Sequence, residues 1–329
     1  MPRKKNEMPR TKERLHFWWS GIRQELSSWS SAQQRTVKLL KQVENGIPDD
    51  IQARLDYYVK RSRPFDYNAQ IYLGSLSWGY REMYYIDLMR VAKGFGKRFR
   101  INTEFEVVVE IPPIATVLRT RPLTGNHDNS ILFPLNRFRH FYFPEDPVAW
   151  DQKIPFMAWR GRANGQPPRI ELLKRYHDHA EHNIGHRVKT DSYPGYKDFM
   201  SVQDHMKYRY IPAFEGFNEA TSLKWIMNSG SVPVCHPMRY EGWFMEGRLE
   251  ADVHYIETRH DLKDLDEKLD WYNRHPEQAQ AIVKNANAWT KQFQNQECED
   301  LIATLVLLRY AKLTRNNIPK ALTPYLDLV

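Results

Sequence analysis

Short apolar runs alternate with longer amphipathic segments through the second half of the chain. Runs at residues 156–159, 185–188, 210–214, 231–235 and 254–257 have the length and flanking turns of strands. Helical spacing predicts helices over 169–179, 202–207 and 219–227, and further helices starting at Asp264, Glu277 and Glu297. Alternation of this kind is typical of a parallel sheet covered by helices on both faces.

The first half is less regular. The pattern predicts one or two amphipathic helices over 17–40, helices over 50–60 and 81–91, and strands over 106–111 and 115–119. Residues 1–14 are basic and polar, which predicts a disordered segment. The helical stretch 276–313 is expected to pack back across both domains.

Composition narrows the class of protein. The chain has 329 residues, 41% hydrophobic and 27% charged, enough for about two globular domains. Apolar runs are too short to span a membrane, and the N-terminus lacks the apolar core of a secretory signal. Two cysteines, Cys235 and Cys298, fit a reducing compartment. We therefore expect a cytoplasmic protein.

The net charge is +8, and six basic residues lie among the first fourteen. A solvated tail and contact with an anionic membrane surface are equally good interpretations, so a peripheral position on the cytoplasmic membrane face stays open. Nucleic acid is not expected as a partner, because no recognised nucleic-acid-binding motif occurs.

Candidate anion-binding residues follow two predicted strands. Arg160 and Arg162 follow the strand 156–159, and Arg169 starts the next helix. Residues 214–225 form a second strand–turn–helix segment that contains Lys224. In α/β proteins, phosphates bind at strand ends and helix N-termini. This sequence lacks both the dinucleotide-binding glycine motif and the Walker motif, so the site would be of another kind. This pattern predicts a nucleotide-diphosphate site, with a structural ion pair as the alternative role for Arg160.

Two acidic or histidine-rich clusters are candidate metal sites. Asp178, His182 and His186 would share a face only of a continuous helix, and Gly185 is expected to end it. The pair Asp264 and Asp266 fits a solvated helix face better than a metal site. No metal and no cofactor are expected.

Several ordered segments carry a resemblance to a known family. Trp159-Arg160-Gly161 and Ala220-Thr221-Ser222-Leu223-Lys224-Trp225 are two of them, and the others are residues 135–141, 207–210, 215–216, 241–247, 254–256 and 261–265. Together they resemble glycosyltransferase family 90, its bacterial branch in particular. That family includes lipopolysaccharide-modifying, capsule-associated and protein O-glucosyltransferase proteins. The resemblance covers residues 50–312.

The resemblance implies a GT-B-like fold of two Rossmann-like α/β domains with a cleft between them and a long helical C-terminus. It implies a basic tail and helices at 1–45, an acceptor-side domain at 46–150, a nucleotide-sugar domain at 151–300, and a helix at 301–329 that packs toward the N-terminal domain. It also implies inverting, metal-independent transfer from a UDP-sugar. The donor residues implied are Arg160, Arg162, Arg169, Gly216, Phe217, Asn218, Glu219, Ala220, Thr221, Ser222 and Lys224. Glu241 is either a ribose ligand or a helix cap.

The catalytic base is not assigned by the resemblance. Eukaryotic members carry an aspartate where this chain has Thr120, which cannot act as a base. Asp128 and His127, on the loop that follows, are the nearest candidates. The expected function is transfer of a hexose, glucose above others, to a saccharide or glycolipid acceptor of the lipopolysaccharide or surface-glycan type. The alternative is a degenerate glycan- or nucleotide-binding module.

Overall fold

The computed structural model describes residues 11–65, 71–77, 79, 82–105 and 110–329. Contacts divide the chain into two compact units, and each unit is drawn from separate stretches of sequence. Unit 1 contains residues 139–239 and 246–294, and unit 2 contains residues 11–138, 240–245 and 295–329. The chain therefore passes between the units more than once.

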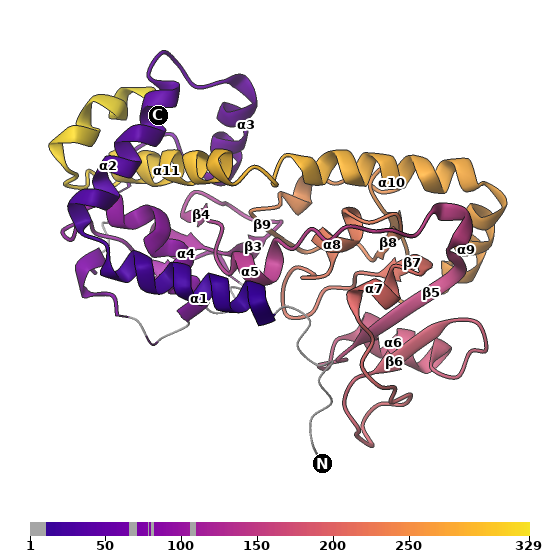
Figure 1. The fold of residues 1–329 in the computed structure, drawn as a ribbon. Coiled ribbons are helices and arrows are strands. Elements are labelled where there is room, and N and C mark those ends of the chain that lie inside the picture. The colour runs from indigo at the N-terminus through magenta and orange to yellow at the C-terminus, as the bar shows by residue number, and fades with distance from the viewer. Residues whose placement is uncertain (1–10, 66–70, 78, 80–81, 106–109) are drawn as a thin grey trace. The chain divides into compact units, whose positions relative to one another are not determined.

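Unit 1 is built on a parallel sheet (Figure 1). In the fully described stretch 139–294 its strands are ordered β10-β8-β7-β5-β6, and every neighbouring pair is parallel. The strands are β5 (Ile154–Gly161), β6 (Asn183–His186), β7 (Tyr208–Pro212), β8 (Val232–Cys235) and β10 (Ile256–Glu257). The mixed α/β class with a parallel sheet, expected from the alternating pattern, is confirmed.

Helices connect and flank these strands. They are α6 (Pro167–Tyr176), α7 (Val202–His205), α8 (Leu223–Met227), α9 (Leu265–Arg274) and α10 (Pro276–Lys291). Prolines occupy the first turns of α6 and α10, where a missing N–H costs no hydrogen bond. Short α7 is capped by Ser201, whose hydroxyl accepts a hydrogen bond from the backbone N–H of Asp204.

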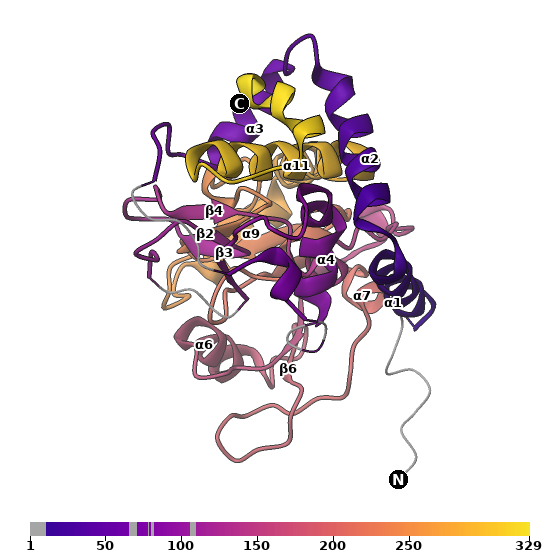
Figure 2. The same cartoon turned by 90° about the vertical axis from the view of Figure 1, so that its left-hand side faces the viewer.

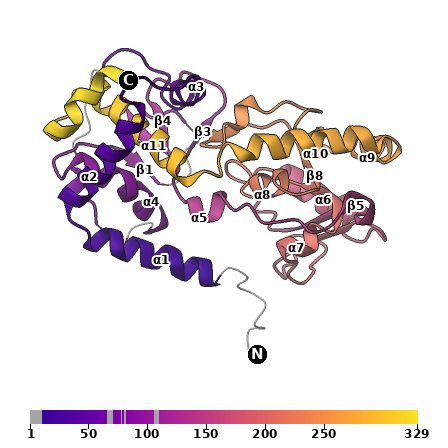
Figure 3. The same ribbon diagram turned by 45° about the horizontal axis from the view of Figure 1, so that its top comes forward.

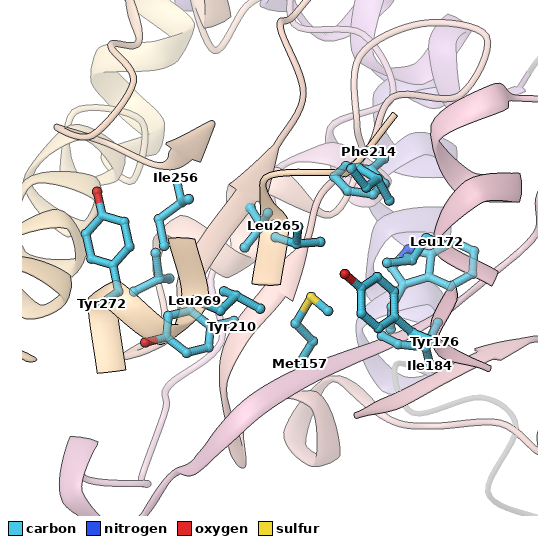
Figure 4. Packing of buried hydrophobic residues seen from close by; sticks show 14 of the residues in the cluster. Met157, Leu172, Tyr176, Ile184, Tyr210, Phe214, Ile256, Leu265, Leu269 and Tyr272 are labelled. Atoms are coloured by element: carbon cyan, nitrogen blue, oxygen red, sulfur yellow. The ribbon is translucent and has the colours of Figure 1, made fainter. Parts of the chain in front are cut away.

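The core of unit 1 lies between the sheet and its helices. Met157 and Tyr210 from the strands meet Leu172 from α6 and Leu265 and Leu269 from α9 (Figure 4). Each is at most 4% exposed, and full burial of such a side chain contributes about 1.5–3 kcal/mol. The hydroxyl of Tyr176 in α6 donates to Asp266 in α9 at 2.7 Å, so these two helices share one side of the sheet.

Unit 2 combines helices with small sheets. Among its described residues, β1 (Thr103–Glu104), β2 (Thr116–Leu118) and β4 (Ser130–Leu132) form a parallel sheet. A second pairing joins β3 (Thr120–Pro122) to β9 (Tyr240–Gly242) in antiparallel register. The helices are α1 (Thr11–Leu26), α2 (Trp29–Leu40), α3 (Asp49–Tyr58), α4 (Glu82–Ala92) and α11 (Gln296–Leu313), and α5 (Arg137–His140) spans the boundary between the two units along the chain.

Helix α11 forms the centre of unit 2. It contacts α2, α3 and α4 (Figure 2). It is buried all round, with residues such as Leu301, Leu305 and Leu308 at 3% exposure or less. Its N-terminus is capped by Asn295, whose side chain accepts hydrogen bonds from the backbone N–H groups of Glu297 and Cys298. No helix among the described residues combines the length and apolarity that crossing a membrane requires.

Several predicted elements differ from the structure. Residues 11–14, expected in a disordered segment, belong to α1. The helix expected over 219–227 begins only at Leu223. The helical stretch 276–313 is two helices, interrupted before Asn295. The strand predicted over 106–111 lies largely outside the described residues.

Candidate nucleotide site in unit 1

The carboxyl end of the unit 1 sheet holds a cluster of basic side chains. The crossover from β5 leads to β6 on one side, and the chain then returns over β5 to β7 on the other side. A reversal of this kind is a topological switch point, and ligands of open α/β sheets bind in the crevice beside it. The switch point lies between β5 and β7, so the residues that follow these two strands are the first candidates for binding.

Arg169 joins the two strand ends at this switch point. Its Nε and Nη2 donate hydrogen bonds to the carbonyl oxygen of Phe214, after β7, at 3.2 and 2.7 Å. Its Nη1 donates to the carbonyl oxygen of Arg162, after β5, at 3.0 Å. The guanidinium is therefore fixed in one plane at the edge of the sheet. The side chain of Arg162 is exposed beside it.

Gly216 allows the close approach of Arg169. A Cβ atom at residue 216 would lie 3.2 Å from Nη2 of Arg169, tighter than ordinary van der Waals contact. A backbone that passes this close to a cation is a feature of phosphate-binding turns. The next residue, Phe217, is 59% exposed, so the tip of this turn faces solvent.

Arg169 stays charged in this setting. Its pKa is lowered to about 10, mainly by burial and also by the nearby charge of Arg139, against the opposing effect of the Glu215 carboxylate. A pKa of about 10 leaves the guanidinium cationic at neutral pH. A half-desolvated cation with a second arginine nearby favours an anionic ligand.

The ends of β8 and β10 add two histidines to the same edge. His236 follows β8, and its ring lies 4.9 Å from the ring of His260, which follows β10. Burial lowers the pKa of His236 to about 4, with the charges of His260, Arg239 and Arg169 acting in the same direction. Its Nε2 accepts from the N–H of Glu215 at 3.2 Å. His236 is thus a neutral acceptor that orders the chain after β7.

Glu215 and Arg239 form an ion pair at this edge. The carboxylate of Glu215 accepts from Nε and from the backbone N–H of Arg239 at 3.0 and 2.9 Å. The Glu215 side chain is 4% exposed, whereas that of Arg239 is 51% exposed. Glu215 therefore positions a cationic side chain that reaches solvent beside the cluster.

Arg160, also predicted at the donor site, bonds to the opposite neighbour of β5. Its guanidinium donates to the carbonyl oxygens of Trp159, Asn183 and Asp198, and to the side-chain oxygen of Asn183 at 2.7 Å. Trp159 is the preceding residue of β5, whereas Asn183 lies on β6 and Asp198 in the loop that follows it. The structure therefore places Arg160 at the β5–β6 edge and Arg169 at the β5–β7 edge.

The predicted loop 217–222 lies next to Gly216 but does not begin a helix. Ser222 precedes α8 and makes no side-chain capping bond. The side-chain nitrogen of Asn218 is buried and has no hydrogen-bond partner in the described part of the chain, and buried amides of this kind usually have one. Glu219 lies 3.4 Å from Nδ1 of His140. Ala220 is buried and Thr221 is half-buried.

Lys224 lies inside unit 1 rather than at its surface. Its ammonium donates to the carboxylate of Glu246, and the two side chains are 2% and 1% exposed. The predicted phosphate cation is therefore paired with a buried acid within the same unit.

Glu241 lies in unit 2, on β9. Its carboxylate accepts from Nε of Arg121 at 2.7 Å and from the hydroxyl of Tyr57. Arg121 is fully buried and also donates to the carbonyl oxygens of Ser130 and Tyr57 at 2.9 Å. Glu241 caps no helix, because it stands within a strand.

The base candidates also lie in unit 2. His127 is 6% exposed, with Nε2 2.8 Å from the carbonyl oxygen of Pro122 and Nδ1 3.1 Å from Nζ of Lys60. Burial lowers its pKa, and the charges of Arg121 and Lys60 act in the same direction. Asp128 is one-third exposed and lies 3.9 Å from Arg61. Asp128 is accessible to an acceptor hydroxyl, whereas both ring nitrogens of His127 have partners.

The hypothetical metal clusters are separated by the fold. Helix α6 ends at Tyr176, and His186 ends strand β6, so Asp178, His182 and His186 share no helical face. Asp264 accepts from Thr258, and Asp266 accepts from Tyr176. In the described part of the chain, no group of three or more histidine, cysteine or acidic residues has the arrangement of a metal site.

Sequence reasoning missed part of this cluster. His236, Arg239 and His260 follow predicted strands directly or closely, so the rule that selected Arg160 also applies to them. Arg139 gave no such signal, because it precedes the first strand of the unit and only the fold brings it near Arg169.

The protein is of the α/β class, with a parallel sheet and basic side chains at the switch point of that sheet. Residues 142–322 match the family model described as Glycosyl transferase family 90. The chain is 39% identical over 231 residues to O-glucosyltransferase LpsA of Dichelobacter nodosus, which covers 70% of this chain and 72% of that protein. It is 33% identical over 152 residues to Protein O-glucosyltransferase 2 of Danio rerio, which covers 41% of this chain and 28% of that protein.

The chain belongs to glycosyl transferase family 90. The resemblance carried by the ordered sequence segments is confirmed.

Proposed function

We propose that this protein transfers a hexose, glucose above others, from a UDP-sugar to a saccharide acceptor of the lipopolysaccharide or surface-glycan type. Membership of family 90 supports glycosyl transfer, and the O-glucosyltransferase relatives support glucose. The observation that carries the donor site is Arg169, fixed between the ends of β5 and β7.

Arg169 and the turn 216–218 hold the diphosphate in this proposal. The guanidinium supplies positive charge, and the buried amide of Asn218 supplies a donor. Arg162, Arg139 and Arg239 add charge around them. Arg160 has a supporting role, because its bonds hold β6 and the following loop in place. Glu241 and Lys224 remain predictions for donor contact, and each is paired with a buried partner.

The chemical step is a single displacement with inversion. The acceptor oxygen bonds to the anomeric carbon as the bond from that carbon to the phosphate oxygen breaks. UDP leaves with the electron pair, and the base takes the acceptor proton. Fixed cations can stabilise the charge that develops on the leaving phosphate, which fits a metal-independent mechanism. We assign the base to Asp128, the more accessible of the two candidates.

The donor site is tested by thermal shift with UDP, GDP, UDP-glucose, UDP-galactose and UDP-xylose, with and without EDTA. A ligand about 100-fold above its dissociation constant adds about 2.7 kcal/mol of stability. We expect a uridine-selective shift that EDTA leaves unchanged, that is lost in Arg169→Ala, and that persists in the matched variant Arg160→Ala.

Two results would contradict this assignment. Loss of the shift in Arg160→Ala with a folded protein would return the donor role to Arg160. A shift that disappears with EDTA would require a metal ion.

The base assignment is tested by turnover. Asp128→Asn is expected to lower kcat about 100-fold or more with the nucleotide shift intact, because proton transfer contributes about 10²–10⁴-fold to such reactions. Full turnover in Asp128→Asn would remove Asp128 from the mechanism.

A binding module without turnover is the second candidate. The position of the family's eukaryotic aspartate is occupied by Thr120, which has no carboxylate. Thr120 is fully buried, and its hydroxyl donates to the carbonyl oxygen of Glu241 at 3.1 Å. Nucleotide binding without sugar transfer to any glycan acceptor would favour this candidate.

A further inference from the structure

Four large apolar side chains are exposed along one line of α1 in unit 2. Leu15, Trp19, Ile22 and Leu26 are 55%, 59%, 39% and 82% exposed, respectively. Spacings of four, three and four residues place them on one face of a helix. We call this face the α1 stripe.

The opposite face of α1 holds the helix against unit 2. Phe17, Gly21 and Gln24 repeat the same spacing two residues later, which is about 200° around the helix. Gly21 is buried, and Nε2 of Gln24 donates to the carbonyl oxygen of Ile86 in α4 at 3.1 Å. Helix α1 lies beside α4 at the edge of its unit (Figure 3). The α1 stripe therefore points away from the core that anchors the helix.

Arginines flank the stripe. Arg14 and Arg23 are exposed on α1. Arg23 also lines a hollow of about 350 Å³ together with Arg35 and Arg90, and Ser20 and Ser27 of α1 contribute hydroxyl groups to it. Of these three arginines, Arg90 is paired with Asp300 at 2.8 Å. The hydroxyl groups of Ser20 and Ser27 donate to carbonyl oxygens of α1 itself, both at 2.7 Å. The hollow keeps an excess of positive charge, and its guanidinium groups are donors of the kind that hold a phosphate.

We propose that the α1 stripe docks this protein on an anionic phospholipid surface, with the stripe at the boundary of headgroups and acyl chains and the arginine hollow against a lipid phosphate. An apolar face one side chain wide, with exposed arginines beside it, is the form of an interfacial helix, although Glu13 and Glu25 of α1 are exposed as well. A stable interface with a second copy of the chain buries about 800 Å² per partner. The apolar stripe is too narrow for an interface of that size, because charged residues lie close beside it. The basic residues Arg3, Lys4, Lys5 and Arg10, which precede α1 in the sequence, add attraction of the same sign.

The test is flotation of the full chain with vesicles of phosphatidylcholine alone and of phosphatidylcholine mixed with phosphatidylglycerol. No nucleotide or acceptor is present, so the result is independent of the proposed transferase activity. We expect binding to the mixed vesicles only, weakened by salt. The double variant Trp19→Ser, Leu26→Ser is expected to bind the mixed vesicles at least about tenfold more weakly than the wild type. Arg23→Glu is expected to lose affinity as well.

Matched controls separate the stripe from general surface effects. Trp271→Ser with Val188→Ser removes exposed apolar side chains of unit 1, which are 41% and 39% exposed. Lys284→Glu reverses an exposed charge on α10. All three substitutions are expected to leave vesicle binding unchanged, with circular dichroism confirming that every variant is folded.

Three results would overturn the proposal. They are no binding to mixed vesicles at low salt, equal binding to both vesicle types, and undiminished binding of the stripe variant. Light scattering adds a fourth: self-association that the stripe variant abolishes, without vesicle binding, would make a second copy of the chain the occupant.

Discussion

At the scale of single residues, the partners of a cation decide its role. Arg160 lies near the end of β5 and Arg169 in the helix that follows it, and both are half-buried. Arg169 bonds to carbonyl oxygens beyond β5 and β7 and lies against a glycine. Arg160 bonds to the β6 side of the sheet. The first arrangement places a cation at the switch point of the sheet, and the second holds the edge strand β6 in place.

Lys224 gives the sharpest prediction at this scale. Lys224→Met is expected to lower the free energy of unfolding by about 3–5 kcal/mol, because it leaves the carboxylate of Glu246 buried without its ammonium partner. Urea denaturation measures the change. The double variant Lys224→Met, Glu246→Leu is expected to recover part of the loss.

The control is the exposed pair Lys207 and Asp204, whose side chains are 58% and 47% exposed. Lys207→Met is expected to leave the free energy of unfolding nearly unchanged, because solvent screens an exposed ion pair. If Lys224→Met unfolds no more easily than Lys207→Met, yet loses the nucleotide shift, Lys224 is a donor ligand as the sequence pattern predicted.

At the scale of elements, helix boundaries were the least predictable feature. Helices α10 and α11 are separate because Asn295 has an extended backbone, and its side chain caps the N-terminus of α11. The delayed start of α8 has a different cause: the chain after β7 turns at Gly216 and Asn218, where Gly216 N–H donates to the carbonyl oxygen of Asn218 at 3.1 Å. Apolar spacing reveals a helical face but not which residue begins it.

The cap of α11 can be tested directly. Asn295→Ala is expected to destabilise the protein by about 1 kcal/mol, because two backbone N–H groups lose their acceptor. Asn295→Asp, which keeps an acceptor oxygen, is the control and is expected to unfold at nearly the same urea concentration as the wild type. Equal losses in both variants would mean that the amide nitrogen, not the capping oxygen, matters.

At the scale of the whole molecule, buried titratable groups link stability to pH. Burial is the main cause of a lowered pKa at five histidines. The pKa falls to about 4 at His182, His205 and His236. The pKa values of His127 and His254 are lowered as well. Between pH 4 and the ordinary histidine value of 6.5, the unfolded chain binds protons that the folded chain does not. Asp87 acts oppositely, because burial raises its pKa to about 7.

The histidines outnumber Asp87, so unfolding takes up protons in this range. The free energy of unfolding is therefore expected to fall as pH decreases from 6.5 toward 4, by up to about 1.4 kcal/mol per pH unit for each net proton. Urea unfolding at about pH 7 and about pH 5 measures the slope. His205→Gln is expected to flatten the slope, and a wild-type stability independent of pH would contradict the burial of neutral histidines.

Much of unit 1 was predictable from sequence, because its strands are short apolar runs separated by amphipathic helices. Their parallel pairing followed from that alternation. Arg169 was predictable as a candidate for the same reason, since it lies in the first turn of the helix after a strand. The family was predictable too, because its segments occur in a fixed order along the chain.

The sequence by itself determined the α/β class and the family, and it placed the candidate phosphate site after the strands of unit 1. Only the tertiary structure decided which basic residue stands at the switch point, since strand order is a property of pairing and not of spacing. It also decided that Lys224 is buried against Glu246, that Glu241 pairs with Arg121 in unit 2, and that one face of α1 is exposed. These are long-range contacts between segments distant in sequence, and a local pattern of polar and apolar residues contains no record of them.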